Sequence, residues 1–260
     1  MLLRRFMQHV KEQNWFAVGL DVIVVIVGIY LGIQVANWND SRKEQEQVAI
    51  YLDRLKQDLT NQIGSIDVHI EIETKLHEVS QNMLLNFFER KEIIVDEELT
   101  SSTSFITSRK TFKKIDATYN EILNSGYLNL ITNQEIKSAI VTYYQELYRI
   151  DSIITYNNNN ITDAFILPTI LQLIPYGEPE GFSTILFRRS GLPTVEATED
   201  DIDRTHSKLN TAAYEIVNRP ENTVVLTNAI SMKMSASSIN RDMLEALKKD
   251  TQGLIELLEK

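Results

Sequence analysis

Hydrophobic residues are concentrated in one stretch near the N-terminus. Between Trp15 and Trp38 the chain reads WFAVGLDVIVVIVGIYLGIQVANW, with Asp21 as its only formally charged residue. A helix of about 20 such residues crosses a hydrocarbon layer roughly 30 Å thick. Tryptophan is enriched where such helices meet the lipid headgroups. We therefore predict a transmembrane helix over residues 15–38, with Trp15 and Trp38 at its two membrane interfaces.

Two other kinds of segment, a buried core helix and a cleaved signal peptide, are also apolar. A buried helix of a soluble domain is one, but an apolar run of this length, bounded by Trp and rich in β-branched residues and Gly, is uncommon there. A cleaved signal peptide is the other, and it requires a small residue at the cleavage point and another three places before. Ile33 lies three places before Ala36, so the sequence favours an uncleaved anchor.

Charges beside the anchor indicate its orientation. Residues 1–14 contain Arg4, Arg5 and Lys11 and have a net charge of +2. A short basic tail stays in the cytoplasm, whereas a long following domain is translocated largely regardless of its charge. We predict a cytoplasmic tail over residues 1–14 and an extracytoplasmic domain over residues 39–260. The tail is either an interfacial helix, with Arg4 and Arg5 among lipid headgroups, or a short solvated segment.

Two features of the span suggest a contact with another helix. Asp21 is costly in the membrane unless its carboxyl reaches the headgroups, is protonated or pairs with a polar group on another helix. Gly28, Gly32 and Ala36 follow one another at steps of four, which lets a second helix backbone approach closely. Such spacing also arises by chance in Gly-rich spans. One hypothesis is therefore that a second copy or another membrane protein contacts these four residues. The other is that the spacing has no such role.

Beyond the span the hydrophobic pattern is helical. Apolar residues recur at steps of three and four from Ser41 to about Glu92, which predicts a long helix that continues out of the membrane helix. The polar segment 91–114 follows, with a short helix from Asp96. Between them these signals leave no strand, because the one alternating stretch, around residue 68, lies inside the unbroken helical pattern.

Local signals divide the middle of the chain into further helices. Asp116 precedes a helix that Gly126 closes, and Thr132 with Glu135 forms a capping box for the next. Asn157 to Asn160 are expected to interrupt that helix, before an apolar helix that bends or ends near residue 168.

The C-terminal third begins with an irregular loop near residues 175–195, where Pro and Gly recur. Thr198 with Asp201 then predicts a helix through Val217, and Pro220 begins the last helix. The apolar positions of that last helix are expected at Val224, Leu226, Ile230, Met234, Ile239, Met243, Leu247, Leu254 and Leu258. The predicted fold is all-α, with a single N-terminal transmembrane helix continuing into an elongated antiparallel helical bundle.

Composition excludes several functional classes. The chain of 260 residues has no Cys, which rules out disulfide frameworks, Cys-ligated zinc and thiol nucleophiles. Residues 39–260 carry a net charge of −11, and a domain this acidic is repelled by phosphate backbones. We therefore expect no nucleic acid among the partners.

Candidate metal ligands are few. His77 and Glu78 begin a zincin-like pattern, but Gln81 stands where the second His is required. His69, Glu73 and His77 share one helix face, and a solvated polar stripe explains them better than a metal site, because one helix seldom offers three ligands to one ion. The acidic run from Glu196 to Asp203 lacks the alternating ligands and Gly of a calcium loop. We predict no catalytic, metal-binding or cofactor-binding residues.

Two stretches carry a resemblance to a known family. QNWFAVGLDVIVVIVGIYLGIQVANWND and ATYNEILNSGYLNLITNQEIKSAIVTYY resemble an uncharacterised family of bacterial single-pass inner-membrane proteins with a QNW…GIQVANWN anchor and a helical extracytoplasmic domain. Asp21, Gly28 and Gly32 match polar and small positions of that anchor. The resemblance implies a Gram-negative inner membrane and a periplasmic domain, and it implies no activity.

These observations favour a membrane-anchored interaction or scaffold module that faces the periplasm and acts without catalysis through a partner protein or membrane complex. The alternative is a ligand-sensing periplasmic helical domain that passes a signal to another membrane protein, since residues 1–14 are too few for an output domain. An enzyme that uses carboxylates near residues 175–195 is a third hypothesis, which no motif supports.

Overall fold

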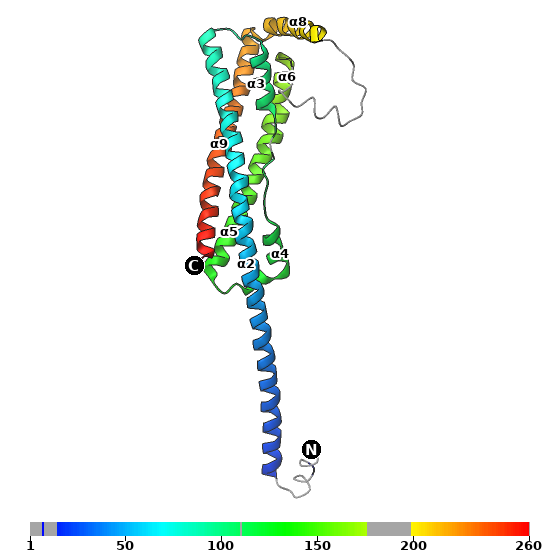
Figure 1. Ribbon diagram of the computed structural model, residues 1–260, viewed down its shortest axis with the longest axis vertical. Coiled ribbons are helices and arrows are strands. Elements are labelled where there is room, and N and C mark those ends of the chain that lie inside the picture. The colour runs from blue at the N-terminus through cyan, green and yellow to red at the C-terminus, as the bar shows by residue number, and fades with distance from the viewer. Residues whose placement is uncertain (1–6, 8–14, 110, 176–198, 260) are drawn as a thin grey trace. The chain divides into compact units, whose positions relative to one another are not determined.

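A single helix, α2, runs from Trp15 to Arg90 and contains the whole apolar stretch. The structure is a computed structural model that describes Met7 and residues 15–109, 111–175 and 199–259, and every extended regular element in those ranges is helical (Figure 1). The all-α prediction is thus confirmed for the described part of the chain. Residues 176–195 of the predicted loop and the predicted cap at Thr198 lie outside the described residues.

The remaining elements follow in chain order. They are α3 (Glu97–Thr107), α4 (Ala117–Ser125), the 3₁₀ helix η1 (Tyr127–Leu130), α5 (Gln134–Tyr156), the π-helix η2 (Asn157–Ile166), α6 (Leu167–Leu173), α8 (Glu199–Val217) and α9 (Pro220–Leu258).

Local signals place several of these boundaries where the sequence predicts them. The Asp96 carboxylate accepts a hydrogen bond of 2.8 Å from the backbone N–H of Leu99, which caps α3. Gly126 has φ +81° and ends α4 in the left-handed conformation that glycine adopts without strain. Pro220 is the first residue of α9, where its missing N–H costs no helical hydrogen bond.

The start of α5 differs from the predicted capping box. Asn133, and not Thr132, caps the helix: its side-chain oxygen accepts hydrogen bonds from the N–H groups of Glu135 (2.9 Å) and Ile136 (3.2 Å). Because α5 begins at Gln134, Glu135 is the second helical residue and not the third, which a capping box requires.

The asparagine run after α5 does not interrupt the helix, contrary to the sequence prediction. Asn157–Ile166 continue as η2, a π-helix, and the N–H of Leu167 donates to the carbonyl of Thr162 five residues earlier. Asparagine is a poor helix former, but here the Asn157 side chain hydrogen-bonds to α9. This tertiary contact outweighs the local preference.

The chain divides into two compact units. Unit 1 comprises Met1–Leu55 and Ala117–Lys137, and unit 2 comprises Lys56–Asp116 and Ser138–Lys260. The division falls inside α2, which continues through it without a break.

Unit 2 is built on three lengths of helix: α2 from Lys56 onward, the continuous run α5–η2–α6, and α9. Ion pairs and hydrogen bonds order α9 along α2, because Lys248 pairs with Asp67 (2.7 Å) and the Met234 carbonyl lies 3.1 Å from His77 Nδ1. Residue numbers fall along α9 as they rise along α2, so these two helices are antiparallel. The α5–η2 run is also antiparallel to α9, because Tyr143 contacts Thr251 and Asn157 contacts Asn240.

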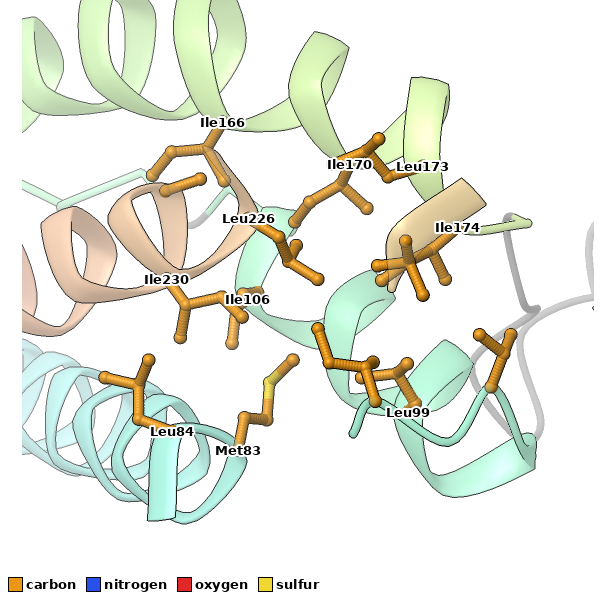
Figure 2. Close-up of a cluster of buried hydrophobic side chains, with 14 of the residues drawn as sticks. Met83, Leu84, Leu99, Ile106, Ile166, Ile170, Leu173, Ile174, Leu226 and Ile230 are labelled. Atoms are coloured by element: carbon orange, nitrogen blue, oxygen red, sulfur yellow. The ribbon is translucent and has the colours of Figure 1, made fainter. Parts of the chain in front are cut away.

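Apolar side chains fill one end of unit 2. Figure 2 shows α2, α3, α6 and α9 directing side chains toward one another in this cluster. Labelled members are Met83, Leu84, Leu99, Ile106, Ile166, Ile170, Leu173, Ile174, Leu226 and Ile230, all buried. Full burial of one such side chain contributes about 1.5–3 kcal/mol, so this cluster is a main source of the stability of unit 2.

Unit 1 pairs α4 and η1 with the Gln45–Arg54 part of α2. Arg54 forms an ion pair of 2.7 Å with Glu121, and the rings of Tyr51 and Tyr127 lie 5.3 Å apart. Gln45 donates to the Leu130 carbonyl at 3.2 Å. The left-handed turn at residue 126 changes the direction of the chain between α4 and η1. Both elements contact α2.

A pair of glycine substitutions tests this turn. Gly126→Ala should destabilise the protein by about 1–2 kcal/mol, because an L-residue is strained at positive φ. Gly64→Ala, inside α2, should stabilise it by about 0.5–1 kcal/mol through helix propensity. A Cβ meets no atom within 4 Å at either position, so backbone conformation alone should separate them. Urea denaturation of the detergent-solubilised chain, followed by circular dichroism, measures both; equal effects would contradict the left-handed turn.

Candidate functional site

Polar side chains meet inside the core of unit 2, next to the apolar cluster. They come from α2, η2 and α9 and are buried or half-buried. We call them the polar layer: His69, Glu73, Asn157, Thr162, Asp163, Lys233, Ser237 and Asn240.

Helical spacing places the α2 members of the layer on one face of α2, and the α9 members on one face of α9. His69 and Glu73 are four residues apart on α2, and Lys233, Ser237 and Asn240 follow at steps of four and three on α9. Residues at such spacing share one helix face. On α9 this is the face that also buries Ile230 and Leu244, so the polar residues are directed into the core.

Asn240 joins all three helices. Its amide nitrogen donates to Glu73 Oε1 of α2 at 2.9 Å, and its side-chain oxygen accepts from Asn157 Nδ2 of η2 at 2.8 Å. Asn240 is 3% exposed and Glu73 is 5% exposed. Unpaired, a buried polar group of this kind is costly, and these two bonds remove most of that cost.

Lys233 is a second buried charge, at 4% exposure. Its ammonium donates to the Thr162 hydroxyl of η2 at 3.1 Å. Asp163, the next residue of η2, forms an ion pair of 2.9 Å with Arg109, which follows α3. The layer thus contains two acidic groups, Glu73 and Asp163, and one buried cation, Lys233, while the exposed Arg109 pairs with Asp163 from outside it.

Burial and charge act against each other on these groups. Burial raises the pKa of Glu73, while the hydrogen bond from Asn240, the charge of Lys233 and the hydroxyl of Ser237 oppose the rise. The Ser237 hydroxyl makes no hydrogen bond of ordinary geometry, so its effect on Glu73 is weaker than that of Asn240. Burial lowers the pKa of Lys233, and the charges of Glu73 and Asp163 oppose that fall.

His69 is the one imidazole of the layer. Its Nε2 lies 3.7 Å from Glu73 Oε1 and has no hydrogen-bond partner. The ring meets Phe112 edge-on, with centroids 5.5 Å apart. Burial lowers the pKa of His69, so the folded protein favours the neutral ring.

The π-helix provides one wall of this layer. π-Helical turns are rare and are frequently found at functional sites. The wider winding of η2 faces both Asn240 and Lys233 with polar side chains, from Asn157 and Thr162. This combination of an unusual helix and buried charges held by hydrogen bonds makes the polar layer the candidate functional site.

The structure corrects the sequence interpretation of His69, Glu73 and His77. They do not form a solvated stripe: the first two are buried, and His77 is half-buried with its Nδ1 3.1 Å from the Met234 carbonyl. In the described ranges no group of three or more His, Asp and Glu side chains is arranged to hold a metal ion.

Sequence reasoning missed the α9 half of the layer. It placed Val224 and Ile239 on the apolar face, but they are 58% and 56% exposed, whereas Lys233 and Asn240 are buried. One signal was present: Lys233 and Asn240 lie at helical spacing from Leu226, Ile230 and Leu247. A lysine on an apolar face is an indication of a buried charge with a partner.

The residues predicted to contact the membrane or another helix lie in α2 or before it. Trp38 is exposed, Asp21 is half-exposed, and a Cβ at Gly28 or Gly32 would meet no atom within 4 Å. Ala36 is exposed on the same helix. The Trp15 side chain, Arg4 and Arg5 lie outside the described structure. Their proposed contacts stay predictions.

Comparison with known proteins gives one match. The model of a family described as "Family of unknown function (DUF6090)" matches residues 21–164, more than half of the chain. No curated protein and no solved structure matches. The matched range contains the α2 and η2 members of the polar layer and ends before α9.

Removing Asn240 tests whether the layer is held as described. Asn240→Ala should cost about 2–4 kcal/mol, because one neutral hydrogen bond and one to a carboxylate are lost and Glu73 stays buried. Asn228→Ala, at an exposed position of α9, is the matched control and should change stability by less than about 0.5 kcal/mol. Equal urea midpoints for the two variants would show that the bridging bonds contribute nothing.

Proposed function

We propose that this chain, which belongs to the DUF6090 family of unknown function, is a membrane-anchored helical module that faces the periplasm and acts through a partner protein without catalysis. One observation carries the proposal: in the described part of the chain, α2 is long and apolar enough to cross a membrane, and its apolar part is not covered.

The exposed surface of this part of α2 is the main support for a membrane location. Its most apolar 18-residue window has a mean hydropathy of 2.3 and is 6% buried. Large apolar side chains are exposed on every side of the helix, among them Leu20, Ile23, Ile26, Ile29, Leu31 and Ile33. A core helix of a soluble protein would bury them, and burial in lipid removes the same apolar surface from water.

Charge supports the orientation. The basic tail, with Arg4 and Arg5, favours a cytoplasmic N-terminus. The acidic domain after residue 38 then lies on the periplasmic side of a bacterial inner membrane. An acidic surface is repelled by anionic lipid and by nucleic acid, which favours a protein partner.

The arrangement of the polar layer supports a role without catalysis. Its buried charged groups are held by neutral side chains of the layer: Glu73 by Asn240, and Lys233 by Thr162. A catalytic group needs access to substrate. In the described residues, a pocket of about 180 Å³ is lined instead by residues such as Asn82, Asn86 and Arg90.

One face of the span suits contact with a second helix. At 100° per residue, Asp21, Gly28 and Gly32 fall within about 40° of one another. A carboxyl group and two glycines on one face permit close backbone approach and a polar contact across helices. We propose that a second copy, or a helix of another membrane protein, packs there.

A ligand-sensing domain that signals through another membrane protein is the second candidate. The π-helix and the buried charges of the polar layer favour it, because such features allow two alternative arrangements of packed helices.

Location is tested with single cysteines, since the natural chain has none. Lys75→Cys, at a position whose side chain is 62% exposed, should react with a membrane-impermeant maleimide in intact spheroplasts. Gln8→Cys in the tail should react only after permeabilisation, and the Cys-free parent is the blank. A chain that stays soluble after high-speed centrifugation without detergent would overturn the anchor, and a reversed labelling pattern would overturn the orientation alone.

Association through the span is tested by blocking the glycines. Gly28→Ile with Gly32→Ile should weaken association in a membrane cross-linking assay by roughly tenfold, about 1.4 kcal/mol, because the added side chains keep helix backbones apart. Gly19→Ile is the control, since nine residues at 100° place Gly19 on the opposite face from Gly28. Unchanged association in the double variant would exclude this face.

A further inference from the structure

We propose that the polar layer exchanges partners when it takes up a proton: Glu73 accepts a hydrogen bond from Asn240 of α9 while His69 is neutral, and forms an ion pair with His69 on its own helix when His69 is protonated. This inference goes beyond the membrane-anchored role and holds whichever side of the membrane unit 2 faces.

The geometry gives Glu73 two directions of interaction. Its Oε1 accepts from Asn240 at 2.9 Å and lies 3.7 Å from His69 Nε2. The side chains of His69 and Glu73 are 5% and 6% exposed. A small rotation of the carboxyl group is therefore enough to exchange an interhelical hydrogen bond for an ion pair within α2.

His69 has a vacant position for the proton. Its Nε2 makes no hydrogen bond, and Glu73 Oε1 lies 3.7 Å away. The edge-on ring of Phe112 covers another side and offers no competing charge. A proton on Nε2 would therefore be directed at Glu73.

Charged groups on each neighbouring element determine which partner Glu73 prefers. Opposite Glu73, α9 contributes Lys233; η2 contributes Asp163, which pairs with Arg109 from the segment after α3. On α2, His77 lies two turns from His69 and is bound at the Met234 carbonyl. Ser237, Asn240, Asn157 and Thr162 are neutral. With His69 neutral, Lys233 and Arg109 together match the two carboxylates of the layer, Glu73 and Asp163.

A proton on His69 removes this balance. The layer gains one positive charge in a core where charges interact strongly. Glu73 Oε1 lies 3.7 Å from His69 Nε2, so attraction draws it from Asn240. Because Asn240 then loses its acceptor on α2, the exchange weakens α9 against α2.

The two titratable groups have opposite effects on stability. Burial lowers the pKa of His69 below 6.5, so the stability due to the neutral ring is present above pH 6.5 and is lost as pH falls through the lowered pKa. Burial raises the pKa of Glu73 above 4.5, so its protonation makes the folded state more stable as pH falls. Acid loosening is therefore expected from His69 and not from Glu73.

Hydrogen exchange of the full-length protein in detergent micelles measures the loosening. Protection of the 233–240 amides of α9, corrected for the intrinsic exchange rate, should fall by up to about tenfold per pH unit below pH 6.5. His69→Gln should abolish this dependence, and His77→Gln, the matched control, should retain it. Protection that is independent of pH in the natural chain, or an unchanged dependence in His69→Gln, would overturn the proposal.

Histidine NMR distinguishes partner exchange from simple burial. The chain has four histidines, so the His69 signal can be assigned by substitution. Glu73→Gln should lower the measured pKa of His69, because the cation loses its partner, and Lys233→Met should raise it, because Glu73 loses its competing cation. An unchanged pKa of His69 in Glu73→Gln would overturn the exchange, and this arm decides the matter even if Lys233→Met does not fold.

Discussion

Removal of apolar side chains from water is the constraint on which the structure depends, and helix α2 meets it in two ways. From Lys56 onward, one face of α2 packs against α9 and the α5–η2–α6 run, and residues such as Leu59 and Ile66 are buried there. Before Trp38 the same helix is apolar on all sides and is not covered by the described chain. A helix that is apolar all round belongs in a protein core or a membrane, which is why the proposed function begins with the anchor.

Unit 2 combines an apolar cluster with a polar layer, and the two act differently. The apolar cluster in Figure 2 stabilises unit 2 in a way that depends little on which apolar side chain meets which. In the polar layer, by contrast, a shift of α9 by one residue would separate Asn240 from Glu73 and leave buried charges without partners. Buried charges add little net stability. The polar layer therefore aligns the helices, and its titratable groups make that alignment sensitive to protons.

The family match and the polar layer overlap only in part. Residues 21–164 include the anchor region, α3, α4 and α5, together with Glu73 and most of η2. Lys233 and Asn240, which complete the layer, lie in α9. The proposed switch therefore depends on both the part of the chain that defines the family and the part that follows it.

Local chemistry in the sequence determined the all-α class, the apolar span and several boundaries. Asp96, Gly126 and Pro220 act on their own backbone or the next few residues, so no distant contact is needed to predict their effect. The long helix through residues 41–90 follows from its apolar spacing for the same reason.

Only the tertiary structure decided what happens where distant residues meet. The asparagine run stays helical because Asn157 finds Asn240 83 positions along the chain. His69 and Glu73 are buried because α9 brings Lys233, Ser237 and Asn240 to them, whereas the sequence by itself suggested a solvated stripe. A side chain's spacing indicates which neighbours share its helix face, but the partner that compensates a buried charge comes from another helix, and no local pattern specifies it.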